Sequence, residues 1–251
     1  MEALASFVPL VTFAFLVAFI YSSVGHGGAS GYLALLSFYA LPHEPMAASA
    51  LCLNLLVAGM SFTAFMRAGH FSSKLTFPFI STSIPFAFLG GLFKIPKEFY
   101  ALLLAAALIW AALRLFLDAY LETKRKPVIQ PLPQGWPFLI GGLVGLLSGI
   151  VGVGGGIFLS PIILFFNWAN AKQTAAASAF FIFVNSFAGL LGRMVRGSFS
   201  LQFSPLIVGL VAAAFLGGVL GSRLGAVHFS NGWLKRILAV VLLTASIKLL
   251  L

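Results

Sequence analysis

The sequence predicts an all-α polytopic membrane protein built from two pseudo-symmetric repeats. Of its 251 residues, 61% are hydrophobic and 8% are charged, whereas an ordinary soluble domain has roughly 25% charged residues. Several apolar runs reach the roughly 20 residues that cross a hydrocarbon core, with charges almost only at their ends. Motifs of the first half also recur, in order, in the second half.

Each half is expected to contain a glycine-interrupted helical element and three transmembrane helices, about eight helical elements in all. The first apolar run has Glu2 but no preceding basic residue and no evident cleavage site, so it is interpreted as a membrane element rather than a signal peptide. The interrupted elements are predicted at 7–41 and 136–168. The helices that follow them are predicted at 46–67, 75–93, 98–118, 173–195, 203–223 and 233–250.

The longest polar segment, 118–135, is interpreted as a linker between a first repeat (1–117) and a second (136–251). It contains three prolines and the basic run Lys124 to Lys126, and clustered basic residues favour the cytoplasmic side of a membrane. The net charge of +10 is therefore assigned to loops and helix ends rather than to a nucleic-acid surface. Arg67 and Arg196 are expected to anchor helix ends at the interface, with attraction of anions as a secondary role.

The repeat is visible as matched motifs. "VGHGG" at 24–28 corresponds to "VGVGG" at 151–155, and "FLGG" occurs at both 88–91 and 215–218. If each interrupted element crossed the membrane, the repeats would be parallel; if it entered and returned, they would be inverted. About 33 apolar residues divided by glycines are short for two complete crossings, which favours inverted repeats.

The glycine clusters are the first candidate binding residues. Glycine permits tight turns and close approach, and the helix start that follows leaves unpaired N–H groups that suit an anion. The alternative is that these glycines only allow helices to pack closely, which is the preferred interpretation for Gly141, Gly145 and Gly149. The candidates in the two breaks are Gly25, Gly27, Gly28, Gly154, Gly155 and Gly156.

Polar side chains within apolar helices add further candidates, each of which has an alternative structural role. His26 breaks the symmetry of the two clusters, because Val153 takes its place in the second, and it could bind an anion or carry a proton. Asn54 and Asn185 lie well inside their helices, where interhelical hydrogen bonding is the alternative role. Secondary candidates are Ser49, Ser178 and Ser81, although the hydroxyls of 81–83 are favoured as repairing the backbone near Pro85.

Several function classes are excluded by what these elements contain. No Asp or Glu lies deep in a predicted span, which argues against carboxylate proton relays and favours neutral donors for an anion. His26 has no second ligand at metal spacing and no partner typical of nucleophilic catalysis. The glycine clusters lack the context of phosphate-loop or dinucleotide motifs. The prediction therefore includes no metal site, no cofactor, no catalytic residue and no enzymatic activity.

The duplicated segments "SVGHGGASGYLALLSF" and "GIVGVGGGIFLSPIILFF", together with "RAGHF", "RGSFS" and the two "FLGG" elements, resemble the sulfite exporter TauE/SafE family, also called the 4-toluene sulfonate uptake permease family. The resemblance covers nearly the whole chain. It implies a multi-pass transporter of the inner cell membrane that moves sulfur-containing anions such as sulfite or sulfoacetate.

The predicted function is secondary transport by alternating access, with the anion bound at the two breaks. An anion channel and a carrier of a different small organic anion are the alternatives. The expected partners are a small anionic substrate, a coupling ion that is either a proton or sodium, and the lipid bilayer. An oligomer is compatible with the sequence.

Overall fold

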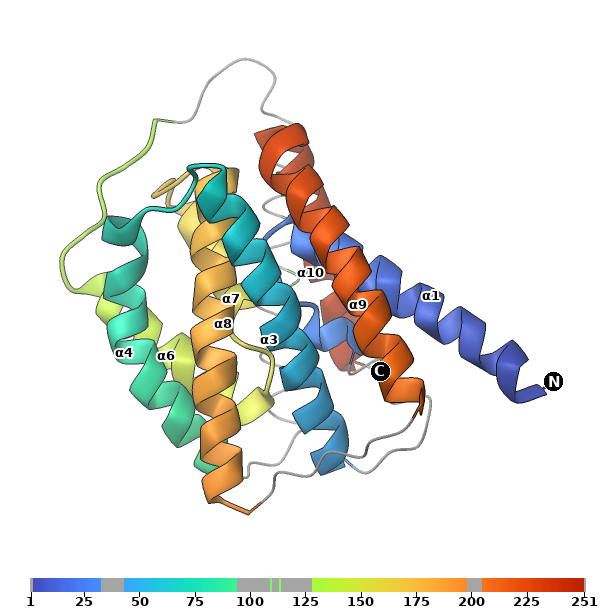
Figure 1. The fold of residues 1–251 in the computed structure, drawn as a ribbon. Helices are drawn as coiled ribbons and strands as arrows, with labels where there is room; N and C mark the ends of the chain where they lie inside the picture. Colours follow the sequence, from blue (N-terminus) through green and yellow to red (C-terminus); the bar gives the residue numbers. More distant parts are fainter. Residues whose placement is uncertain are drawn as a thin grey trace.

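The computed structural model describes residues 2–32, 43–93, 109, 113, 128–197 and 205–250. Within these residues all regular structure is helical, as predicted (Figure 1). The elements are α1 (Glu2–Ser23), α3 (His43–Arg67), α4 (Ser73–Leu92), α6 (Trp136–Val151), α7 (Gly156–Phe165), α8 (Ala171–Val195), α9 (Pro205–Arg223), the π-helical turn η1 (Leu224–His228) and α10 (Asn231–Leu250).

Four stretches of the described helices are long and apolar enough to cross a membrane, so the multi-pass prediction is confirmed: Ser49–Arg67, Ser73–Leu92, Ala171–Val195 and Val208–His228. The helices predicted at 46–67, 75–93, 173–195, 203–223 and 233–250 form within a few residues of their expected bounds. Most of the helix predicted at 98–118 and most of the linker lie outside the described residues.

Helices α3 and α8 pack against each other at the centre of the bundle and run in opposite directions (Figure 1). Two contacts with the carbonyl oxygen of one residue show that the two helices are antiparallel. His70, just after α3, and Lys172, at the start of α8, both approach the carbonyl oxygen of Ala226, at 3.0 Å and 3.1 Å. The end of α3 therefore lies beside the beginning of α8.

Helix α6 packs against α4 along a line of small residues. A side chain on Gly141, Gly145 or Gly149 would collide with the backbone of Phe79, Ser83 or Ala87 in α4. The predicted role of these three glycines in close packing is thus confirmed. The pairing also shows that α6 runs in the same direction as α4, because both sets of positions increase together.

Helix α1 packs against α9 in the same manner, on the opposite side of the central pair (Figure 1). Side chains on Gly217, Gly221 and Gly225 would collide with the backbone of Phe15, Phe19 and Ser23. Two close-packed parallel pairs, α1 with α9 and α4 with α6, therefore flank the central antiparallel pair.

The second interrupted element turns back on itself. It descends as α6, breaks at 152–155 and returns as α7, whose Gly156 and Ser160 face Ile182 and Ser178 of α8 in reverse order. The amide N–H of Gln130, before α6, donates to the carbonyl of Asn167, after α7, at 2.9 Å. The residues that enter and leave this element thus meet at one end of the bundle.

Candidate anion-binding site

The first break lies between α1 and a helical segment that begins at Ala29, and residues 21–29 are all buried. Gly25 and Gly28 have φ of 78° and 87°, in the left-handed region that favours glycine. A side chain on Gly25 would collide with the backbone of Ala175 in α8, and one on Gly27 with the side chain of Asn54 in α3. The glycines therefore bring this break against both central helices.

The second break, between α6 and α7, approaches the same helices. Gly152, Gly154 and Gly155 have φ of 78°, 79° and 77°. A methyl group placed on Gly154 would come within 2.7 Å of the Oγ of Ser186 in α8, and would also press against the amide of Asn54. The structure thus brings the two glycine clusters together around α3 and α8.

Asn54 joins the two breaks. Its Oδ1 accepts from the amide N–H of Ala29 at 3.2 Å, and its Nδ2 donates to the carbonyl of Val153 at 3.3 Å and to Ser186 Oγ at 2.8 Å. The side chain is 0% exposed. Asn54 therefore uses both ends of its amide to hold the protein's own backbone.

His26 extends from the first break to α7. Its Nδ1 approaches the carbonyl of Val24 at 3.1 Å, and its Nε2 lies 3.3 Å from Ser160 Oγ. Ser160 in turn lies 2.7 Å from Ser178 Oγ and 2.8 Å from the carbonyl of Gly156. Because Ser160 has one proton, it can donate to His26 or to Gly156 but not to both at once.

Several donors at the second break have no acceptor. In the described part of the chain, the backbone N–H groups of Gly154, Gly155, Gly156 and Ile157 donate to no acceptor, nor do those of Gly27 and Gly28 in the first break. Among the residues that the structure describes, the side-chain amide of Asn185 and the hydroxyl of Ser148 are also buried without a hydrogen-bond partner. Such orphaned polar groups are rare in folded proteins.

Asn185 of α8 and Ser148 of α6 lie on the helix faces that pack around the second break. A methyl group on Gly155 would come within 3.0 Å of Ser148 Cβ and within 2.8 Å of the ring of Phe181. Asn185 lies one helical turn after Phe181 and one turn before Gly189, which faces Gly149 of α6. The buried polar groups of Ser148 and Asn185 that have no partner among the described residues therefore lie on the parts of α6 and α8 that flank this break.

Two secondary candidates lie elsewhere. Ser49 is buried near the start of α3. Ser81 is exposed on α4 and donates to the carbonyl of Pro78, within its own helix, at 3.0 Å. Thr82 and Ser83 also approach carbonyls three residues back, and Thr82 donates to the carbonyl of Phe138 in α6 at 2.6 Å. The predicted repair of the backbone at Pro85 concerns the carbonyl of Ser81, four residues back, and stays a prediction.

Sequence reasoning missed Ser148, Ser160 and Ser186. Ser148 lies just before the second glycine cluster and Ser160 one turn after it, so proximity to the cluster was an available signal. Ser186 follows Asn185 directly. Its contact with Asn54 depends on the rotation of α8, which the sequence pattern does not determine.

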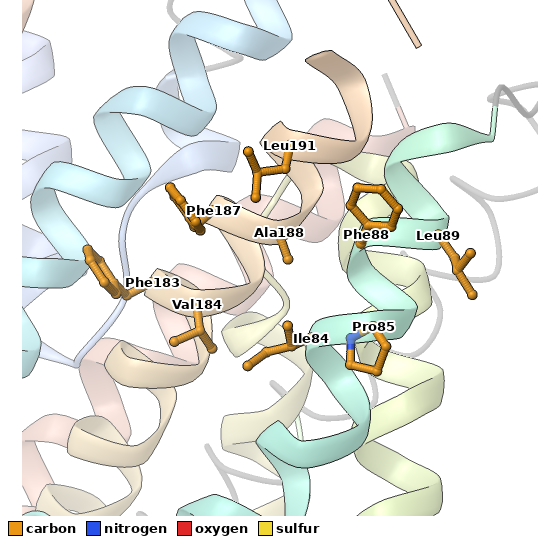
Figure 2. Close-up of a pocket in the computed structure, with 9 residues that line it drawn as sticks. All are labelled: Ile84, Pro85, Phe88, Leu89, Phe183, Val184, Phe187, Ala188 and Leu191. Carbon is orange, nitrogen blue, oxygen red and sulfur yellow. The ribbon is translucent and has the colours of Figure 1, made fainter. Parts of the chain in front are cut away.

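Two hollows lie near the breaks, and none of the candidate glycines or asparagines lines either of them. A cavity of about 10 Å³ beside Ser160 is lined by Val24, Thr174 and Lys235, among others, which is comparable to the space for one water molecule. A groove of about 600 Å³ runs between α4 and α8, and Figure 2 shows that apolar side chains such as Phe187 and Leu191 line it. That groove offers no donor to an anion.

Comparison with known proteins identifies the family. The profile of the family described as sulfite exporter TauE/SafE matches residues 10–249, nearly the whole chain. The chain belongs to the sulfite exporter TauE/SafE family. This TauE/SafE protein is therefore a probable membrane transporter and not an enzyme, and the family implies a small anionic substrate.

Two relatives share much of their length with this TauE/SafE protein. One is described as probable membrane transporter protein y4hK of Sinorhizobium fredii and is 35% identical over 94% of this chain and 95% of its own. The other is a probable membrane transporter protein of Haemophilus influenzae, 26% identical over 71% of this chain and 69% of its own. No solved structure matches.

Proposed function

We propose that this protein is a secondary transporter of sulfur-containing anions, sulfite or small organosulfonates such as sulfoacetate, which bind between the two glycine-rich breaks. The observation that carries the proposal is the set of unpaired donors at the second break, including the amide of Asn185. Donors buried without acceptors favour a ligand that supplies several acceptor oxygens. Sulfite and sulfonate groups are such ligands.

The packing of the helices supports two inverted repeats, 1–117 and 136–251, joined by the linker 118–135. Helix α3 corresponds in order to α8, and α4 to α9, and each pair runs in opposite directions (Figure 1). Each interrupted element also packs against the other repeat, α1 against α9 and α6 against α4. Inverted repeats with broken helices at their interface are typical of secondary transporters.

Transport then proceeds by alternating access. The residues of both breaks are almost entirely buried, so the proposed site is enclosed in the described conformation. Entry of an anion requires the breaks to separate from α3 and α8 on one side at a time. We place the protein in the inner cell membrane, with this exchange across it.

A thermal-shift series on the purified protein tests the proposal. Sulfite, sulfoacetate, taurine, isethionate and thiosulfate are compared with aliphatic carboxylates. A ligand that binds the folded state at about 100 times its Kd stabilises it by roughly 2.7 kcal/mol. We expect sulfite or a sulfonate to raise the melting temperature more than carboxylates of equal charge.

The matched variant is Asn185→Leu. Because the amide of Asn185 has no hydrogen-bond partner among the described residues, replacing it by an apolar side chain should leave the melting temperature unchanged or higher. The response to the anion should be lost. A variant that keeps the full anion response, or a protein that responds to none of the sulfur anions, would refute the site. Saturable uptake into proteoliposomes, without single-channel currents, separates the carrier from a channel.

A further inference from the structure

A second groove, of about 790 Å³, runs along the outer face of the bundle between α3 and α9, with α8 as a third wall. Most of its lining is apolar, including Leu56, Phe180, Phe215 and Val219. The groove is separate from the central breaks, because no residue of either glycine cluster lines it.

Two arginines lie at one end of this groove. Arg67 and Arg223 are the last residues of α3 and α9, and both line the groove and are exposed. Neither has a hydrogen-bond or ion-pair partner in the described part of the chain, and no acidic side chain lines the groove. Favourable interaction with the helix dipoles explains a basic residue at each helix end, but not why both charges share one apolar groove.

The length of the groove matches one half of a bilayer. From Arg67 to Leu55, the lining residue farthest along α3, the helix rises about 18 Å. The hydrocarbon core is about 30 Å thick, so each leaflet accounts for about 15 Å. A path for a hydrophilic substrate would need polar lining over its length, whereas this groove is charged only at the membrane-surface end.

The charged end is fixed by contacts that do not involve the two arginines. Lys172 donates to the carbonyls of Ala226 at 3.1 Å and Val227 at 3.4 Å, and both of these residues line the groove. The π-helical turn η1, which contains them, is thereby tied to α8. As far as the described residues show, Arg67 and Arg223 remain available to a ligand at this end.

We propose that this groove binds one anionic phospholipid, with an acyl chain along α3 and α9 and the phosphate between Arg67 and Arg223. Two features of the groove match such a lipid. The two arginine side chains match the negatively charged phosphate, and the apolar lining, which is as long as one leaflet is deep, matches an acyl chain. The site is independent of the transported anion and of the proposed function.

The test uses the full-length protein purified in a neutral detergent and titrated with phosphatidylglycerol, phosphatidylcholine or free glycerol phosphate. The melting temperature is followed at constant ionic strength. Phosphatidylglycerol should stabilise the protein at lower concentration than phosphatidylcholine, and glycerol phosphate should not stabilise it. Arg67→Gln with Arg223→Gln should weaken the apparent affinity for phosphatidylglycerol roughly 30-fold, the loss expected of two interfacial cationic contacts.

The matched control is Lys74→Gln with Arg236→Gln, which removes two exposed charges outside the groove. It should change the affinity by no more than about twofold, because screened charges that touch no lipid contribute little. An equal loss in this control, equal stabilisation by the two lipids, or stabilisation by glycerol phosphate would each overturn the proposal.

A second variant tests the groove itself and retains both arginines. A Cβ on Gly59 would lie 3.4 Å from the ring of Phe183, an ordinary contact, so Gly59→Leu should fold and fill part of the groove. It should reduce stabilisation by phosphatidylglycerol even if the double arginine variant does not fold. Unchanged stabilisation in Gly59→Leu would refute the acyl-chain site.

Discussion

Asn54 and Asn185 are both buried asparagines in the central helices, yet their hydrogen bonding is opposite. The sequence predicted that both lie deep in the bundle, because each is far from its helix ends. Within the described ranges, Asn54 has three protein partners, whereas the amide of Asn185 has none. The sequence could not separate the two roles, because they depend on which backbone groups lie opposite each amide.

Replacing Asn54 by leucine should lower the melting temperature. The change removes three hydrogen bonds and leaves the N–H of Ala29 and the carbonyl of Val153 without their partner. The expected loss is roughly 1–3 kcal/mol. Thermal unfolding in detergent measures it, with Asn185→Leu as the control of equal size change. If both variants unfolded at the same temperature, the assigned difference between the two asparagines would be wrong.

At the scale of elements, the lengths of the apolar runs were sufficient to predict the helices. Glycine clusters marked both breaks, and the fold places them together against α3 and α8. The partner of each helix was not predicted, because the choice depends on tertiary fit rather than on local pattern. One signal was present, since the matched "FLGG" motifs contain Gly90 and Gly217, which face the backbones of α6 and α1.

Alanine at Gly155 should be more destabilising than alanine at Gly69. Both glycines have φ of 77°, so each substitution introduces strain of about 1 kcal/mol or more. A Cβ at Gly155 would also come within 2.8 Å of the Phe181 ring, whereas nothing lies within 4 Å of one at Gly69. Melting temperatures of the two variants separate backbone strain from close approach. Equal losses would mean that the break is not closely packed.

At the scale of the whole molecule, each flanking pair contains helices from both halves of the chain, α1 with α9 and α4 with α6. His26 adds a polar connection between the halves, because it belongs to the first break and its Nε2 faces Ser160 of α7. The sequence predicted that His26 makes the two breaks unequal, but it did not predict that Ser160 lies within hydrogen-bond distance of His26.

If a proton is the coupling ion of the proposed transport, His26→Gln should abolish the dependence of anion uptake on a pH gradient. Protonation of His26 would turn its Nε2 into a donor to Ser160, whose own proton could then go to the carbonyl of Gly156 at the start of α7. Glutamine can hydrogen-bond but cannot titrate. Uptake by proteoliposomes with and without an imposed pH gradient measures the effect. Ser178→Ala serves as the control because it leaves the imidazole in place, and retention of pH-driven uptake by His26→Gln would exclude this histidine as the proton carrier.

The carbonyl of Ala226 accepts from Lys172 and lies within hydrogen-bond distance of His70. The end of α3 and the start of α8 thus both contact the turn η1 at one atom, the carbonyl oxygen of Ala226. At the opposite end of the bundle, separate hydrogen bonds join the helices. Arg196 donates to the carbonyl of Phe93, and Arg193 donates to the carbonyl of Ile150. We therefore expect the end of α3, the start of α8 and the turn η1 to stay together at Ala226 when the bundle changes conformation.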